Sequence, residues 1–264
     1  MIGASWPDLI DELDRWHAVG RMATLWWRDD DAVAPTLQLH RLMSVAQGVP
    51  IALAVIPAPA EEALAAWVAR YTGSLSQAPF VILQHGWRHV THAGHGKKSE
   101  FPADRPNNEV DRDISAGRMR LRELFGTLAL PVLVPPWNRF DNSHLSLMSG
   151  CGVSAISCIA PRRTARAAPG IVAVNVHVDL VGWKNGLRFI GEEMALGGLV
   201  WHLRARRLGE VCADEPTGLL SHHLVQDDAT YVFLKRLVEV TTGHTAARWL
   251  DGTEVFDHSI PETA

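Results

Sequence analysis

The sequence predicts an α/β protein built on a parallel sheet or barrel. Short apolar runs alternate with amphipathic stretches along the chain, which is typical of repeated strand and helix units. We find no internal repeat, low-complexity tract or long linker. Because α/β barrels of roughly 250 residues fold as one unit, one large domain is compatible with the 264 residues.

Local signals place the elements of the first half of the chain. A first helix begins near Ser5, has Pro7 in its first turn and ends at Gly20. Further helices are predicted where apolar residues recur with helical spacing, at residues 37–48, 61–70 and 108–125. Buried strands are predicted at the short apolar runs 22–27, 50–56, 80–83 and 130–134.

The second half continues the alternation. Strands are predicted at residues 153–157, 171–178 and 218–220, and helices at residues 142–149, 192–207 and 230–240. A short packing helix is expected after Gly243, with Trp249 among its apolar residues. The whole pattern amounts to about seven strand and helix units.

Composition narrows the class of protein. The chain is 47% hydrophobic and 20% charged, as in soluble globular proteins. Its 29 acidic and 25 basic residues give a net charge of −4 without a basic stripe, which argues against nucleic acid or anionic membrane as partners. Three scattered cysteines fit a reducing compartment. The amino-terminal residues have neither the basic start nor the apolar run of a secretory signal, so a cytoplasmic location is expected.

Three consecutive carboxylates, Asp29, Asp30 and Asp31, follow the first predicted strand. Adjacent like charges repel, so a compensating cation is expected, and either a metal ion or Arg28 meets that need. The alternative is a solvated loop whose aspartates cap the following turn. We favour a functional site, because functional groups in barrels gather where strands end at the carboxyl face.

Two histidines four positions apart, His85 and His89, follow the strand predicted at 80–83. On one helical turn this spacing puts side chains about 5–6 Å apart, so two imidazoles can converge on one ion. Neutral imidazole suits zinc, nickel, cobalt or iron. The alternative is a pair of ordinary core or surface histidines. The role of His92, three positions further on, stays open.

Polar and aromatic residues follow a third predicted strand. Pro135 and Pro136 stiffen the backbone, which would hold Trp137 as a wall and Arg139 as a fixed charge. An ordinary turn is the alternative interpretation. The polar run at 95–105 predicts a solvated surface loop, with a substrate contact through its Glu100 or Arg105 as the alternative.

His222 and His223 follow the strand predicted at 218–220. A histidine at a strand end can act as a general acid, because its reference pKa of about 6.5 lies near working pH. Asp179 and Trp183 form a weaker cluster earlier in the chain. Together these motifs place Asp, His and Arg groups just after several different strands.

In this order the motifs resemble those of the polysaccharide deacetylase family, the NodB-homology group of carbohydrate esterases. The likeness covers about residues 20 to 240. In that family an Asp pair after the first strand supplies a catalytic base and then a metal ligand, and two histidines four positions apart complete the metal site. A proline-containing stretch lines the pocket, and a histidine two positions after a leucine is the catalytic acid.

The resemblance implies a role for each matching residue. Counting back from the helix at residue 36 makes Asp29 the base and Asp30 the metal ligand, with Asp30 and Asp31 as the alternative register. It makes His85 and His89 the other ligands and His222 the acid, after Leu220. The residues expected at the substrate are Asp31, Trp137, Arg139 and His223.

The sequence departs from the family pattern at three positions. The glycine that normally follows the Asp pair is missing, which leaves the register open. Val134 stands where the family has an arginine that orients the base, and that task would pass to Arg139 or Arg28. Gly86 replaces the serine or threonine that follows the first metal histidine.

The resemblance implies a distorted, incompletely closed barrel of about seven strands and helices over residues 1–264, with its core at about 20–240. It implies a metal-dependent deacetylase acting on a small-molecule or oligosaccharide substrate, with zinc as the expected ion and nickel or cobalt as alternatives. Two other functions are kept open. One is a non-catalytic sugar- or metal-binding barrel, and the other is a metal-dependent amidohydrolase acting on a non-sugar amide.

Overall fold

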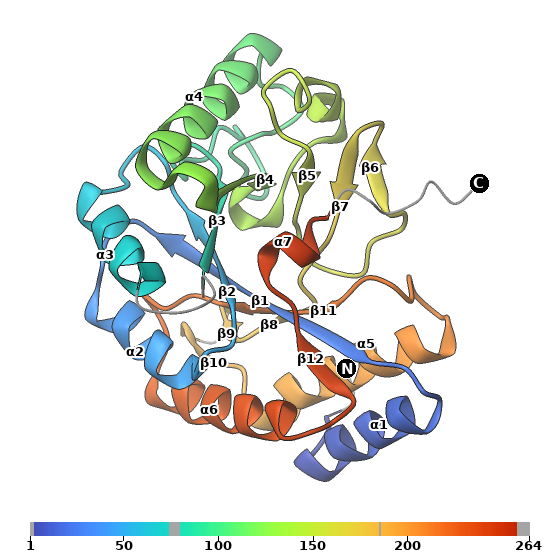
Figure 1. Cartoon of the computed structure of the whole chain (residues 1–264). Coiled ribbons are helices and arrows are strands. Elements are labelled where there is room, and N and C mark those ends of the chain that lie inside the picture. The colour runs from blue at the N-terminus through green and yellow to red at the C-terminus, as the bar shows by residue number, and fades with distance from the viewer. Residues whose placement is uncertain (1–2, 74–79, 185, 258–264) are drawn as a thin grey trace.

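The computed structural model describes residues 3–73, 80–184 and 186–257. Ten of its strands form one curved central sheet (Figure 1). The strands of this sheet are β1 (Ala23–Ala32), β2 (Ile51–Val55), β3 (Phe80–His85), β4 (Ala129–Val134), β5 (Ala155–Ile156), β6 (Arg166–Ala168), β7 (Ile171–Ala173), β8 (Val178–Asp179), β11 (Thr217–Ser221) and β12 (Ala247–Trp249). A separate antiparallel pair consists of β9 (Val181–Gly182) and β10 (Arg188–Phe189).

The strands follow the order β6-β7-β5-β4-β3-β2-β1-β11-β8, and β12 pairs with the start of β1. All pairs in this sheet are parallel except β6 with β7. Within the described ranges β6 and β8, at the two ends of the path, do not pair with each other. The prediction of an α/β fold with an incompletely closed barrel is therefore confirmed.

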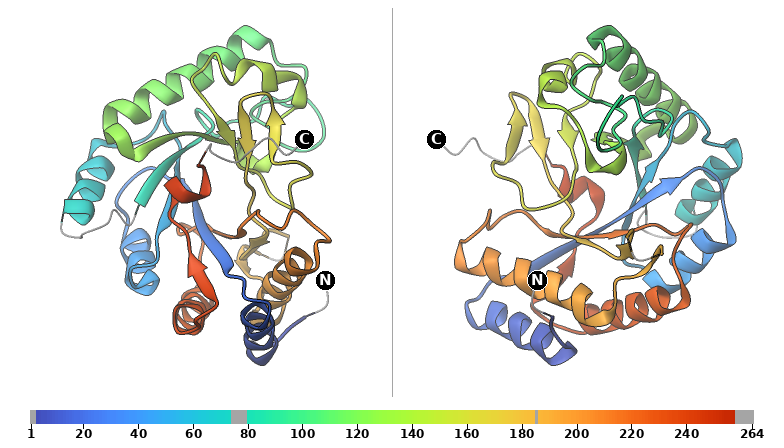
Figure 2. Two further views of the ribbon diagram at one scale, coloured as in Figure 1. Left: turned by 45° about the vertical axis from the view of Figure 1, so that its right-hand side comes forward. Right: turned by 180° about the vertical axis from the view of Figure 1, so that it is seen from behind.

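The long helices cover the outside of the sheet, whereas the short last helix packs against its inner face (Figure 2). They are α1 (Trp6–Ala18), α2 (Leu37–Ala46), α3 (Glu62–Gly73), α4 (Asn107–Phe125), α5 (Glu192–Leu208), α6 (Asp228–Thr242) and α7 (Gly252–Val255), with 3-10 turns η1 (Gly126–Leu128), η2 (Pro136–Asn138) and η3 (Asn142–Leu147). Side chains accept backbone hydrogen bonds at several helix starts, including Ser5 before α1, Thr36 before α2 and Asp227 before α6. None of these helices is long and apolar enough to cross a membrane.

Two apolar clusters lie on opposite faces of the sheet. Ile51, Leu53 and Val55 of β2 belong to the cluster shared with the helices, whereas Ala52 and Ala54 belong to an inner cluster. This alternation follows from the two-residue period of a strand, which points successive side chains to opposite faces. The same alternation sorts the polar residues of the site between the inner and the outer face.

The structure differs from three expectations about elements. The strand predicted at 171–178 is two short strands, β7 and β8, and the helix predicted at 142–149 is the 3-10 turn η3. The segment expected to form a helix after Gly243 forms β12 instead, with Leu25 of β1 paired to Trp249. The first residues of β1 extend beyond the pairing of β1 with β2, so their backbone groups need another partner.

Replacement of Gly218 by alanine is expected to destabilise the protein. A β carbon there would lie 2.5 Å from Nε1 of Trp26 and 2.7 Å from the backbone oxygen of Asn175. We expect Gly218→Ala to lower the free energy of unfolding by about 1–3 kcal/mol, measured by urea denaturation. Gly94→Ala, with no atom within 4 Å of the added carbon, is the matched control and should change stability little. Equal stabilities of the two variants would contradict this packing argument.

Candidate metal and acid–base site

Strand alternation separates the carboxylates of β1. Arg28 and Asp30 share the inner face with Trp26, which belongs to the inner apolar cluster. Asp29 shares the outer face with Trp27, which packs in the cluster beneath the helices. The prediction that the strand ends at residue 27 is therefore too short, and these aspartates are part of the strand.

Asp31 interrupts the alternation. Its φ is 72°, and the pairing of β1 with β2 shifts register between Asp29 and Ala32. With this backbone Oδ1 of Asp31 lies 3.2 Å from Nε2 of His85 and 3.5 Å from Nε2 of His89. A carboxylate and two imidazoles therefore meet at one point.

Asp30 lies in a different environment. Both of its oxygens accept hydrogen bonds from Arg28, at 2.8 Å from Nε and 3.0 Å from Nη2, and both side chains are buried. Arg28 also donates to Oγ of Ser157 at 2.8 Å and to Oδ1 of Asn138 at 2.7 Å. The register with Asp30 as a metal ligand does not fit this geometry, because its carboxylate is held by Arg28 and the carboxylate beside the histidines is that of Asp31.

The two histidines converge through a loop. His85 is the last residue of β3, and His89 lies outside any helix with a φ of 57°, so the expected helical turn is absent from this described segment. Nδ1 of His85 lies 3.0 Å from the backbone oxygen of Val134. Since a carbonyl only accepts, Nδ1 carries a proton, so Nε2 is the nitrogen that has a lone pair for a metal when the ring is neutral.

These three side chains fit a divalent metal ion. Their candidate ligand atoms lie within 4.8 Å of one another, and Oδ1 of Asp31 is buried without a hydrogen-bond partner among the described residues. Burial opposes ionisation of Asp31, but in the metal-free protein the positive charge of the neighbouring His85 outweighs it and holds the pKa of Asp31 well below its usual value. Burial and the charge of His85 lower the pKa of His89. The charged carboxylate and the neutral imidazole are the forms that bind metal.

A second buried group contains His177, His202 and Glu215. Here Nδ1 of His177 accepts a hydrogen bond from the backbone N–H of Gly218 at 2.9 Å. The neutral ring therefore carries its proton on Nε2, which lies 3.4 Å from Oε2 of Glu215. Because Nε2 of His177 has no free lone pair, the group of His177, His202 and Glu215 fits a metal ion less well than the group of Asp31, His85 and His89.

His222 follows β11 on the inner face, beside β1. Its Nδ1 lies 3.8 Å from Oδ1 of Asp179, and the ring of Trp183 packs edge-on against it at 4.7 Å. Trp183 also donates from Nε1 to Oδ2 of Asp179 at 2.7 Å. His222 is close enough for its charge to lower the pKa of Asp31. The weaker cluster of the sequence, Asp179 and Trp183, thus lies beside the predicted acid.

Asp29 and His223 form a buried pair on the outer face. Nδ1 of His223 contacts Oδ1 of Asp29, and Oδ2 of Asp29 accepts from Oγ of Ser221 at 2.5 Å and from the backbone of His223 at 3.1 Å. Neither side chain of the pair is exposed. Strand alternation turns both side chains away from the group formed by Asp31, His85 and His89, and this position does not favour Asp29 as the base or His223 as a substrate contact.

The third motif lies against the histidines. The half-buried Trp137 packs on His89 with ring centroids 4.3 Å apart, and its role as a pocket wall stays a prediction. Arg139 donates to the backbone oxygen of Lys98 at 2.7 Å and so contacts the loop 95–105. Of the two arginines considered as a replacement for the one missing at Val134, Arg28 is the one that contacts Asp30.

Several contacts could not be predicted from the sequence. Asn138 and Ser157 accept hydrogen bonds from Arg28. In the sequence, only their position after a predicted strand indicated that they could lie near the site. Residues 95–105 were predicted to form a solvated loop, but Glu100 and Arg105 in this loop are buried. His92 is exposed and lies outside the metal group.

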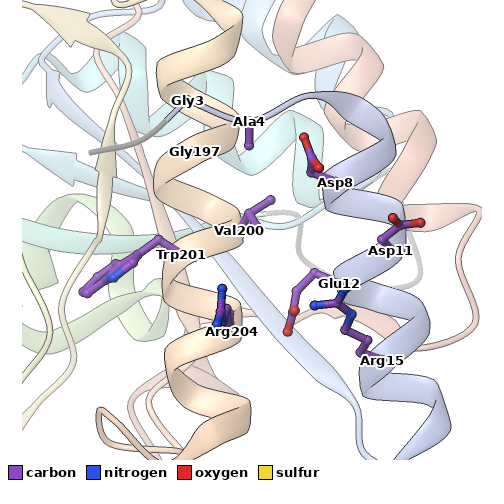
Figure 3. A pocket seen from close by; sticks show the side chains of 10 residues that line it. All are labelled: Gly3, Ala4, Asp8, Asp11, Glu12, Arg15, Gly197, Val200, Trp201 and Arg204. Carbon is purple, nitrogen blue, oxygen red and sulfur yellow. The ribbon is translucent and has the colours of Figure 1, made fainter.

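A groove of about 740 Å³ lies elsewhere, between α1 and α5 (Figure 3). Acidic side chains of α1 line it, together with Arg15 of α1 and with Arg204 and the half-exposed Trp201 of α5. It contains none of the residues singled out in the sequence. The groove is therefore separate from the group formed by Asp31, His85 and His89.

No family model and no curated protein matches the sequence. Solved structures do. A CE4 esterase from Streptococcus mutans matches with a TM-score of 0.57 and 10% identity, covering 95% of this chain and 92% of that one. A family 4 acetyl xylan esterase from Clostridium thermocellum, in complex with a cobalt ion, matches with a TM-score of 0.51 and 15% identity over 88% and 90% of the two chains.

A peptidoglycan N-acetylglucosamine deacetylase matches with a TM-score of 0.53 and 17% identity, covering 89% of this chain and 88% of that one. The three matches share the fold over nearly the full length of each chain. The resemblance stated from the motifs is therefore confirmed for the fold, which is that of polysaccharide deacetylases and CE4 esterases.

Variants of Asp29 and Asp31 are expected to separate stability from metal binding. Asp29→Ala leaves His223 and Ser221 buried without their acceptor, which should cost about 3–5 kcal/mol of unfolding free energy. Asp31→Ala, at a partly exposed position, should cost much less and abolish metal binding. Urea denaturation and metal titration of both variants provide the measurement. Loss of metal in Asp29→Ala without loss of stability would reverse the two assignments.

Proposed function

We propose that the protein is a metal-dependent deacetylase that hydrolyses an acetyl group from a sugar or glycan precursor. The group formed by Asp31, His85 and His89 carries the proposal, because it adjoins a buried carboxylate held by Arg28 and a histidine after β11. The fold shared with deacetylases and esterases supports the same chemistry.

Asp31, His85 and His89 would hold one divalent ion. Two imidazoles and one carboxylate leave coordination positions open, as in catalytic zinc sites. We propose zinc, with nickel or cobalt as alternatives; one of the similar esterases was solved with cobalt. When bound, the ion would polarise the acetyl carbonyl and make a water molecule more acidic.

Asp30 would accept the proton of the attacking water. The two hydrogen bonds from Arg28 fix the orientation of the Asp30 carboxylate, and each oxygen keeps a further lone pair for a proton. Asn138 and Ser157 hold the other donors of Arg28, so the guanidinium cannot rotate freely. Arg28 would thus orient the base, the task of the arginine that the resembling family has in place of Val134.

His222 would deliver a proton to the departing amine or alcohol. Asp179 lies near its Nδ1, which leaves Nε2 as the nitrogen for the substrate. Trp183 packs beside His222 and Trp137 packs beside His89, so each of these histidines has an aromatic side chain next to it. These aromatic side chains suit a small-molecule or oligosaccharide substrate, and the acyl linkage is taken to be N- or O-acetyl.

Metal content and turnover should separate the ligands from the proton-transfer groups. We expect about one ion per wild-type chain by elemental mass spectrometry, and loss of the ion in Asp31→Ala and in the His85→Ala, His89→Ala double variant. Asp30→Asn and His222→Ala should keep the ion and lower kcat on acetylated chitooligosaccharides by about 10²–10⁴-fold. Chelator should abolish wild-type turnover.

Asp228→Ala, at an exposed position, is the matched control. A wild-type protein without ion after incubation with zinc, nickel and cobalt would refute the metal site and favour a binding barrel. An ion without turnover of any acetylated sugar, but with turnover of other amides, would favour a non-sugar amidohydrolase.

Arg28→Lys tests the orientation of the base. Lysine keeps the charge but cannot donate to both oxygens of Asp30, so kcat should fall about 10–100-fold while metal affinity stays unchanged. Steady-state kinetics of Arg28→Lys and Arg139→Lys provide the comparison. A loss confined to Arg139→Lys would show that Arg139, and not Arg28, orients the base.

A further inference from the structure

Glu100 is fully buried although it lies in a strongly polar run of sequence. Its carboxylate accepts hydrogen bonds from the backbone N–H groups of Trp87, at 3.2 Å from each oxygen, and of Arg88 at 2.8 Å. Glu100 thus binds the segment between the two histidines of the proposed metal site.

The glycine at position 86 makes this contact possible. A β carbon on Gly86 would lie only 1.9 Å from Oε2 of Glu100, and the φ of Gly86 is +60°. The resembling family has a serine or threonine at this position. In this chain the carboxylate of Glu100 occupies the space beside the loop, so the departure at Gly86 and the burial of Glu100 belong together.

The loop itself needs support. His89 has a φ of 57°, which is uncommon for a residue other than glycine, and it lies outside regular secondary structure. Successive N–H groups that point to one carboxylate cannot turn away without losing buried hydrogen bonds. The direction of the His89 imidazole relative to that of His85 therefore depends on Glu100.

Arg105 and α4 hold Glu100 in place through hydrogen bonds. Its backbone oxygen accepts from Nη1 of Arg105 at 3.1 Å, and Nη2 of Arg105 donates to Asp113 of α4 at 2.5 Å. The neighbouring Ser99 donates its N–H to Oγ1 of Thr91 at 3.1 Å. A continuous set of hydrogen bonds therefore runs from α4 through Arg105 and Glu100 to the histidine loop.

We propose that Glu100 is a positioning residue that holds His89 in the ligand geometry of the metal site. This rests on the metal site of the proposed function. It predicts that removal of the carboxylate changes the coordination of the ion and frees the loop, although Glu100 itself touches neither the ion nor the substrate.

The test compares Glu100→Ala and Glu100→Gln with wild type. We expect Glu100→Ala to weaken Co²⁺ binding by about 10–100-fold, the range for residues that orient metal ligands, and to shift the visible absorption bands of bound Co²⁺. Hydrogen exchange of metal-free protein should be faster at residues 86–89. Glu100→Gln keeps one acceptor oxygen and should lose less affinity, with a smaller shift of the bands.

Glu123→Ala, which removes an exposed carboxylate from α4, is the matched control and should behave as wild type. Circular dichroism reports whether each variant folds. If Glu100→Ala does not fold, the test uses Glu100→Gln alone. The proposal would be overturned if Glu100→Gln had the Co²⁺ affinity, the absorption bands and the hydrogen-exchange rates of the wild type. If wild-type protein binds no Co²⁺, the metal site fails, whereas faster exchange at 86–89 would still support the role of Glu100 in holding the loop.

Discussion

The guanidinium of Arg28 is a positive charge in the interior of the barrel, and the inner face of the site is arranged around it. A buried charge is costly unless it is paired and hydrogen-bonded. Asp30 supplies the charge, while Ser157 after β5 and Asn138 in η2 accept from its other donors. These bonds join β1 to segments on the far side of the inner cluster. The same interaction that makes the charge tolerable also orients the carboxylate that we propose as the base.

The irregular backbone at Asp31 is the second constraint. A regular strand would turn Asp31 to the outer face, toward the side where Asp29 binds His223. The φ of 72° turns it instead to the histidines of β3 and its loop. Three adjacent carboxylates thereby acquire three environments: Asp29 in a buried pair with His223, Asp30 held by Arg28, and Asp31 beside the two histidines where we propose a metal ion. Identical side chains differ in role because the backbone gives them different neighbours.

The loop between His85 and His89 depends on residues distant from the barrel interior. Its N–H groups are bound by Glu100, which α4 supports through Arg105. On the other side Trp137 packs against His89. In the family that the sequence motifs resemble, a hydroxyl side chain follows the first histidine and an arginine precedes the prolines. Both departures, at Gly86 and Val134, are matched in this chain by charged residues elsewhere, Glu100 and Arg28.

The strand and helix alternation, the spacing of His85 and His89, and the position of His222 after a strand could be read from the sequence, because each depends on local periodicity and on neighbours in the chain. The order of the motifs also indicated the fold. Which of Asp29, Asp30 and Asp31 lies beside the histidines could not be read, since a single residue with positive φ changes the face of a strand residue. The partners of Arg28 and Glu100 were equally out of reach, because hydrogen bonds between segments far apart in the chain exist only once the sheet has brought those segments together.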